Sequence, residues 1–261
     1  MDFSLAYVIA GLIVGFIVGM TGVGGGSLMT PILLYFGIPP TTAVGTDLLY
    51  AAITKGNGVF VHQKKNNINW KITGYLALGS LPAAVITLIA VRHLQFKAGT
   101  ADHLITSMLG IALLLTATAI LFKRALLMWS HRHDVFVTRL TESRRYQLTA
   151  LVGVLLGSLV TLSSIGAGAI GTMALFLIFP RLSTSRLVGT EIAHAVPLTL
   201  IAGLGHAGLG NVNWPLLVNL LLGSLPGIWI GSHMTGVLPE KVMRPTLSLV
   251  LVYAGITLLT R

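Results

Sequence analysis

Charged side chains are scarce in this sequence: they make up 9% of its 261 residues, against 54% hydrophobic residues. A soluble domain carries about 25% charged residues, so this chain has too few to cover a surface that faces water. Acidic residues are the rarest, with 7 Asp and Glu against 17 Lys and Arg. The net charge of +10 would suggest nucleic acid in a soluble protein, but the basic residues fall in short segments between apolar runs. That pattern is typical of membrane proteins, so we expect no nucleic-acid partner.

Cysteine is absent altogether, which excludes disulfides, thiol chemistry and Cys-based metal sites. The His and carboxylate positions show no convincing metal-ligand spacing, and the apolar segments lack a set of nucleophile, base and acid. We therefore expect no metal, no cofactor and no enzymatic activity.

Long apolar runs dominate what is present, and eight segments can be drawn. A helix that crosses the hydrocarbon core needs about 20 mostly apolar residues, so the sequence predicts an all-α polytopic membrane protein. The first 19 residues lack a basic region and a cleavage site, and we expect them to begin the first membrane segment. The segments are 5–36, 41–61, 71–91, 103–122, 147–179, 187–206, 214–236 and 243–260.

The chain repeats itself. Val44 to Asp47 recur 144 positions later as Val188 to Glu191, and Leu78 to Pro82 return unchanged at 222–226. The glycines near the start of the chain recur with a spacing of 142 positions. We expect a first transmembrane repeat at 1–122, a basic loop at 123–146 and a second transmembrane repeat at 147–261.

Segments 5–36 and 147–179 are too long for one span, and each has a small-residue cluster in its middle, TGVGGGS and SSIGAGA. If they are bent spans, the loop Lys and Arg residues divide ten to six between the two sides; if they are re-entrant hairpins, thirteen to three. The positive-inside rule favours the hairpins, with bent spans as the alternative. Each half then has a hairpin and three transmembrane helices, so the repeats are inverted. We expect a bacterial inner-membrane protein with periplasmic termini and a cytoplasmic 123–146 loop.

The two breaks are candidate anion sites. A half-helix should start at about Ser27 and Ala169, and its free N–H groups and positive dipole end would attract an anion. The alternative is that the glycines only let helices pack closely. The candidate substrate-binding residues, with Lys55 from the next segment, are Thr21, Gly24, Gly25, Gly26, Ser27, Lys55, Ser163, Ser164, Gly166 and Gly168.

Few charges lie inside the apolar segments. Asp47 and Glu191 occupy equivalent positions, whereas Lys55 corresponds to Thr199 and is present in one half only. A charge at the bilayer centre costs at least ~2.5 kcal/mol, so it needs a partner or a function. We expect Lys55 to bind substrate, and Asp47, Glu191 and His194 to carry coupling protons. Alternatively, the two carboxylates cap helix starts near the interface, and His194 only packs.

These features resemble the sulfite exporter TauE/SafE family of permeases. The resemblance rests on GLIVGFIVGMTGVGGGSLMTPILL at 11–34, GTD at 45–47 with ITK at 53–55, NINW at 67–70, and a weaker second copy at 153–172. It covers nearly the whole chain. It implies a permease for sulfur-containing or related anions such as sulfite, thiosulfate or sulfoacetate, driven by an ion gradient and not by ATP.

We therefore expect a secondary transporter for a small anion, proton-coupled and working by alternating access. Its partners would be the anion and the lipid bilayer, and a homodimer is left open. The alternatives are an anion channel and a membrane subunit that does not itself transport.

Overall fold

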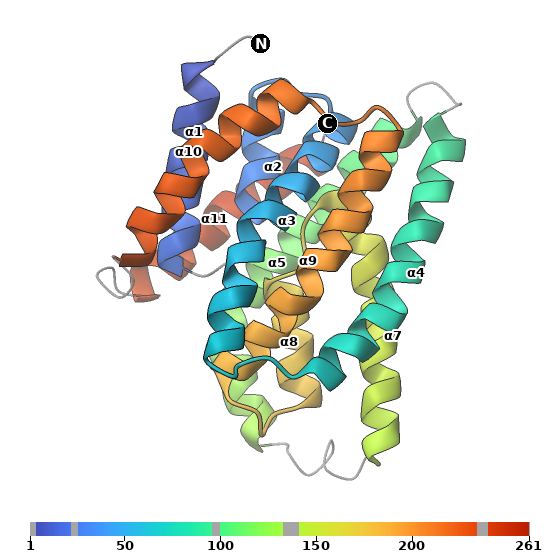
Figure 1. The fold of residues 1–261 in the computed structure, drawn as a ribbon, viewed down its shortest axis with the longest axis vertical. Helices are drawn as coiled ribbons and strands as arrows, with labels where there is room; N and C mark the ends of the chain where they lie inside the picture. Colours follow the sequence, from blue (N-terminus) through green and yellow to red (C-terminus); the bar gives the residue numbers. More distant parts are fainter. Residues whose placement is uncertain (1–3, 22–25, 96–99, 133–140, 234–239, 261) are drawn as a thin grey trace.

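The computed structural model describes residues 4–21, 26–95, 100–132, 141–233 and 240–260, and every regular element in these ranges is a helix. The two halves contain the same series of helices (Figure 1). The first half has α1 (Leu5–Thr21), α2 (Gly26–Tyr35), α3 (Pro40–Lys64), α4 (Trp70–Gln95) and α5 (Thr100–Arg132). The second has α7 (Glu142–Ser163), α8 (Ala169–Ile178), α9 (Thr184–Gly208), α10 (Trp214–His233) and α11 (Glu240–Leu259).

The helices break where the sequence predicts. The second half-helix begins at Ala169, as expected, and the first begins at Gly26, one residue early. The predicted loop at 123–146 is wrong in its extent, because α5 continues to Arg132 and α7 already begins at Glu142. Residues 125–129, ALLMW, favour a helix. The polar residues around them are compatible with a helix that continues beyond the bilayer.

Each broken segment returns to the end of the bundle at which it starts. In the second half, the Tyr146 ring near the start of α7 lies 6.0 Å from the Phe179 ring just after α8. In the first half, the rings of Tyr7 and Phe36 lie 5.4 Å apart in the same relation. The two ends of each broken segment therefore lie close together, which is the arrangement expected of a hairpin.

Two pairs of equivalent helices pack antiparallel to each other. A Cβ on Gly45 of α3 would meet Asn211, just after α9, whereas one on Gly58 would meet Ile192 near the start of α9. The pair α5 and α11 is also antiparallel, with Gly110 against Leu259 and Leu114 against Gly255. The antiparallel pairs α3/α9 and α5/α11 therefore each join one helix of the first half to one helix of the second.

Glycines let the halves interlock. A Cβ on Gly79 of α4 would lie 1.9 Å from the Ala150 carbonyl oxygen of α7, and a Cβ on Gly223 of α10 would lie 1.9 Å from that of Val8 in α1. Close backbone contact of this kind is how small residues stabilise helix pairs in membranes. Each hairpin is thus packed against a helix of the opposite half.

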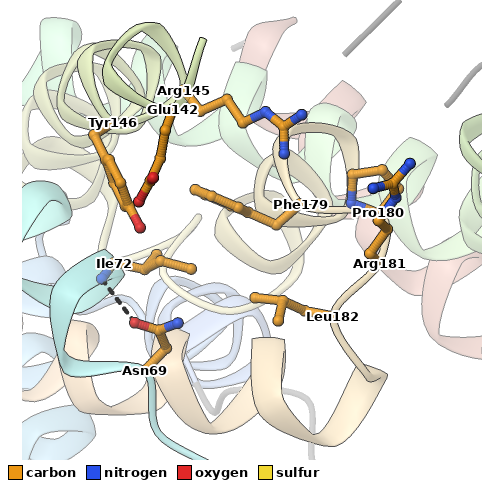
Figure 2. Close-up of a pocket in the computed structure, with 9 residues that line it drawn as sticks. All are labelled: Asn69, Ile72, Glu142, Arg145, Tyr146, Phe179, Pro180, Arg181 and Leu182. Atoms are coloured by element: carbon orange, nitrogen blue, oxygen red, sulfur yellow. Dashed lines mark hydrogen bonds between the residues drawn. The ribbon is translucent and has the colours of Figure 1, made fainter. Parts of the chain in front are cut away.

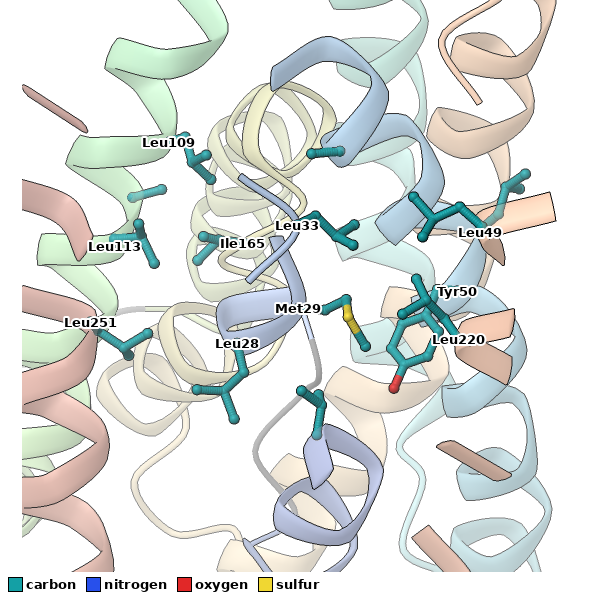
Figure 3. Packing of buried hydrophobic residues seen from close by; sticks show 14 of the residues in the cluster. Leu28, Met29, Leu33, Leu49, Tyr50, Leu109, Leu113, Ile165, Leu220 and Leu251 are labelled. Atoms are coloured by element: carbon teal, nitrogen blue, oxygen red, sulfur yellow. The ribbon is translucent and has the colours of Figure 1, made fainter. Parts of the chain in front are cut away.

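The largest apolar cluster lies where the first hairpin meets α5 and α11 (Figure 3). Met29 and Leu33 of α2 are fully buried, and Leu109 and Leu113 of α5 are equally inaccessible. Ile165 joins the cluster from the break between α7 and α8. This packing fixes the half-helices inside the protein.

Five helices in the described ranges are long and apolar enough to cross a membrane, namely α4, α5, α7, α9 and α10. Large hydrophobic side chains remain exposed on the outside, among them Leu78 and Trp229 at 68% and 67%. A surface of this kind suits lipid and not water. The chain is a membrane protein with multiple apolar helices. Helix α3 is long enough but carries Asp47 and Lys55.

Candidate functional site

Lys55 connects the two halves at the second helix break. Its side chain extends from α3, and its ammonium group donates a hydrogen bond to the carbonyl oxygen of Ala167, two residues before α8 begins. Lys55 is half-buried. The cation therefore lies close to the N-terminus of a half-helix, where an anion would also be attracted.

Asp47 and Glu191 lie along the antiparallel pair of α3 and α9, with Lys55 between them. Asp47 precedes Lys55 by about two turns on α3, and Gly58, about one turn beyond Lys55, packs against Ile192 beside Glu191. Both carboxyl groups interact electrostatically with Lys55. No ion pair shorter than 4.0 Å joins Lys55 to either of them among the described residues.

The two carboxyl groups are fully buried, with exposed fractions of 0% and 1%. The Thr30 hydroxyl of α2 donates to Asp47 Oδ2, while Asp47 Oδ1 and Glu191 Oε1 have no hydrogen-bond partner among the described residues. Each carboxylate is the eighth residue of its helix, and Pro39 and Ser183 occupy the cap positions. The capping alternative is therefore wrong: both groups lie in the protein interior.

His194 lies one turn after Glu191 and is also fully buried. Its Nε2 is 2.7 Å from the Ser80 hydroxyl of α4, and its Nδ1 has no hydrogen-bond partner within the part of the chain that the structure describes. His194 also interacts electrostatically with Lys55. The repeat places Tyr50 at the corresponding position of α3, beside the hydroxyl of Ser224.

The second break explains its own sequence. Gly166 and Gly168 have φ angles of 113° and 154°, a region that only glycine adopts without strain. The Ser163 hydroxyl donates to the Leu159 carbonyl oxygen at 2.6 Å and accepts the Ile165 N–H at 3.2 Å, so it stabilises the turn. Ser164 has φ 57° at the end of α7.

Ser164 is 5% exposed, and its hydroxyl lies beside Asp47, close enough to interact with the carboxyl group. In the described part of the chain, neither this hydroxyl nor Asp47 Oδ1 has a partner at full hydrogen-bond geometry. Two unpaired polar groups therefore meet at the break.

The first break is described only in part. Thr21 ends α1, and Gly26 and Ser27 begin α2, whereas Gly24 and Gly25 lie outside the described residues. Around the second break, the structure brings together side chains of α3, of α9 and of the end of α7: Lys55, Asp47, Glu191, His194 and Ser164.

Sequence reasoning missed Thr30, Tyr50, Ser80 and Ala167. The repeat carried a signal for two of them, since Tyr50 aligns with His194 and Ser80 lies in the repeated LGSLP. Thr30 is one of many threonines in apolar runs, so its residue type gave no signal. Ala167 takes part through its backbone carbonyl group, which every residue has. Within the described residues, no group of three or more His, Asp or Glu could hold a metal.

A helical bundle with repeated broken helices and buried charged groups is an architecture of secondary transporters. The chain belongs to the sulfite exporter TauE/SafE family, whose sequence profile it matches over residues 7–258. It is therefore a membrane transporter of this family.

Similar curated proteins support the same class. The probable membrane transporter protein YjnA of Bacillus subtilis is 40% identical and aligns with 98% of this chain and 100% of its own. YdhB of the same organism is 30% identical, covering 95% of this chain and 96% of the relative. The probable membrane transporter protein MJ0441 of Methanocaldococcus jannaschii is 28% identical, covering 97% and 94%. No solved structure matches the chain significantly.

Proposed function

We propose that the chain is a secondary transporter of a small oxyanion, and that the anion binds between the two halves beside Lys55, where α2 and α8 begin. The observation that carries the proposal is the hydrogen bond from Lys55 to Ala167. An ammonium group has three N–H donors, so the N–H groups of Lys55 that do not point at Ala167 can donate to oxygens of the anion. The first N–H groups of α8 would supply further donors.

The substrate class follows from the donors and from the family. Backbone N–H groups and a Lys can meet several oxygens of one compact anion. Sulfite, thiosulfate and sulfoacetate fit this description, and the family is named after a sulfite exporter. Candidate donors from the first half are Thr21, Gly24, Gly25, Gly26 and Ser27, and those from the second are Ser163, Ser164, Gly166 and Gly168.

Proton coupling would solve an electrostatic conflict in this site. Asp47 and Glu191 as carboxylates would repel an anion held at Lys55, and both are buried with one unpaired oxygen. A proton on either unpaired oxygen removes one negative charge, so anion and proton would occupy the site together. His194, with an unpaired Nδ1 one turn from Glu191, would relay the proton.

Alternating access would use the interlocked halves. The Lys55 contact crosses from one half to the other, so a rocking motion of the halves would break and reform it. The start of α4, the start of α7 and the loop after α8 share one end of the bundle and carry Lys71, Arg145 and Arg181. We infer that this end is cytoplasmic, with inverted repeats and periplasmic termini in an inner membrane.

Transport in proteoliposomes tests the proposal. The purified chain would be reconstituted, and uptake of radiolabelled thiosulfate, sulfite and sulfoacetate measured with an imposed pH gradient. We expect Lys55→Ala to lower uptake at least tenfold. Lys64→Ala removes an exposed lysine from the end of the same helix and should leave uptake unchanged. Equal uptake by wild type and Lys55→Ala would refute the role of Lys55.

A further inference from the structure

A polar cavity lies away from Lys55, at the end of the bundle where α7 begins. It has a volume of about 400 Å³ and is enclosed by the start of α4, the first turn of α7 and the loop between α8 and α9 (Figure 2). Phe179 and Leu182 contribute apolar walls, and Asn69 and Tyr146 contribute polar atoms. A cavity of this size is typical of a small-molecule site.

Two arginines line this cavity. Arg145 extends from α7 above the Phe179 ring, toward the loop that carries Arg181 (Figure 2). Each arginine already interacts within the protein. A guanidinium group has five N–H donors in a planar fork that matches a phosphate, so it can bridge a neighbouring group and a ligand. Glu142 also lines the cavity, but its carboxylate lies 2.9 Å from the Lys71 ammonium. The acidic charge is therefore compensated, and the arginines give the cavity a positive character.

The arginine pair is not a consequence of the repeat. The first-half segment that corresponds to the loop with Arg181 is FGIP at 36–39, which has no charge, and Arg145 corresponds to Phe3. The second half thus has a basic cavity where the first half has an uncharged sequence. A feature that breaks the internal symmetry calls for a reason of its own.

We propose that this cavity binds a phosphate-bearing anion through Arg145 and Arg181, supplied either by an anionic phospholipid headgroup or by free phosphate. The aromatic and aliphatic walls suit the glycerol part of a headgroup, and the two guanidinium groups suit its phosphate. Basic pockets between membrane helices are known to bind lipid headgroups. The site does not depend on the proposed transport mechanism, because none of the residues around Lys55 lines it.

Thermal unfolding of the purified full chain in detergent tests the proposal. Three titrants would be compared: phosphatidylglycerol, zwitterionic phosphatidylcholine, and inorganic phosphate against chloride at equal ionic strength. A ligand that binds only the folded state raises the melting temperature in a saturable way. We expect a saturable rise with phosphatidylglycerol or with phosphate. If phosphatidylglycerol alone acts, the source is lipid, and if phosphate acts equally well, it is soluble.

The matched variants decide whether the cavity is responsible. R145Q/R181Q should weaken binding, so that the half-saturating ligand concentration rises at least tenfold. R144Q/R186Q removes the same charge from two exposed arginines that do not line the cavity and should behave as wild type. Equal loss in both double variants would mean binding to surface charge and would overturn the proposal. No saturable rise in the wild type would overturn it as well.

A charge-neutral variant covers the case in which R145Q/R181Q does not fold. L182W adds a large ring to the cavity wall without changing any charge. It should abolish the rise in melting temperature that ligand causes. An unchanged rise in L182W would place the ligand elsewhere and overturn the proposal.

Discussion

The Ser80 hydroxyl and His194 Nε2 lie 2.7 Å apart, and both side chains are fully buried between α4 and α9. The pair connects helices from different halves and fixes the imidazole one turn from Glu191. If His194 relays protons, this hydrogen bond sets the orientation of its ring and leaves Nδ1 directed elsewhere.

Replacing only Ser80 or only His194 should therefore lower the free energy of unfolding more than replacing both. Ser80→Ala leaves a buried ring nitrogen unsatisfied, at a cost of about 1–3 kcal/mol. A double-mutant cycle of Ser80→Ala and His194→Phe, measured by denaturant unfolding, should give a coupling free energy of about 1 kcal/mol or more. Strictly additive effects would show that the contact contributes nothing to stability.

Gly79 should tolerate no side chain. A Cβ there would lie 1.9 Å from the Ala150 carbonyl oxygen, so α4 and α7 would have to separate. We expect Gly79→Ala to destabilise by about 1–3 kcal/mol, as overpacking does. Gly74 lies on the same helix with nothing within 4 Å of its added Cβ. Gly74→Ala should be neutral or stabilising by up to about 1 kcal/mol, and melting in detergent compares the two. Equal melting temperatures would contradict the close packing of this helix pair.

Gly166 should be required by the backbone of the break. With φ at 113°, an alanine would cost about 1–2 kcal/mol and would shift the carbonyl group that accepts from Lys55. We expect Gly166→Ala to lower transport as well as stability. Gly56→Ala, next to Lys55 on α3 with no atom within 4 Å of the added Cβ, is the control and should retain transport. Full transport by Gly166→Ala would separate the break from the transport site.

Neutralising a buried carboxyl group should uncouple transport from the pH gradient. Glu191→Gln can neither gain nor lose a proton, so gradient-driven accumulation should be lost while exchange of labelled for unlabelled anion continues. Asp47→Asn tests the equivalent position. The control is Glu142→Gln, an exposed carboxylate paired with Lys71, which should leave accumulation intact. Persistent gradient-driven accumulation in both Glu191→Gln and Asp47→Asn would exclude these groups as proton carriers.

Much of this architecture could be predicted from the sequence. The small-residue clusters located both breaks to within a residue of where α2 and α8 begin. Glycine and serine interrupt a helix, and the repeat places one such cluster at the equivalent position of each half. Loop charges favoured hairpins, and the Tyr7–Phe36 and Tyr146–Phe179 contacts bring the two ends of each broken segment together, as a hairpin requires.

The rest required coordinates for physical reasons. Lys55 could be identified as a cation within an apolar segment, but its partner is the Ala167 carbonyl oxygen, 112 positions away. Every residue has a backbone carbonyl group, so the sequence does not show which one accepts this hydrogen bond. Thr30 is one of many hydroxyl residues in apolar runs, so only its contact with Asp47 distinguishes it. The depth of Asp47 and Glu191 could not be predicted either, because each follows a loop by only a few residues.

The most direct test of the central claim is to locate the bound anion. Crystals grown with a selenium analogue of the preferred anion, such as selenite in place of sulfite, would reveal selenium by anomalous scattering. We expect one strong peak within hydrogen-bond distance of Lys55 Nζ, beside the start of α8, and its loss in Lys55→Ala. A peak elsewhere in the protein that persists in Lys55→Ala would contradict it.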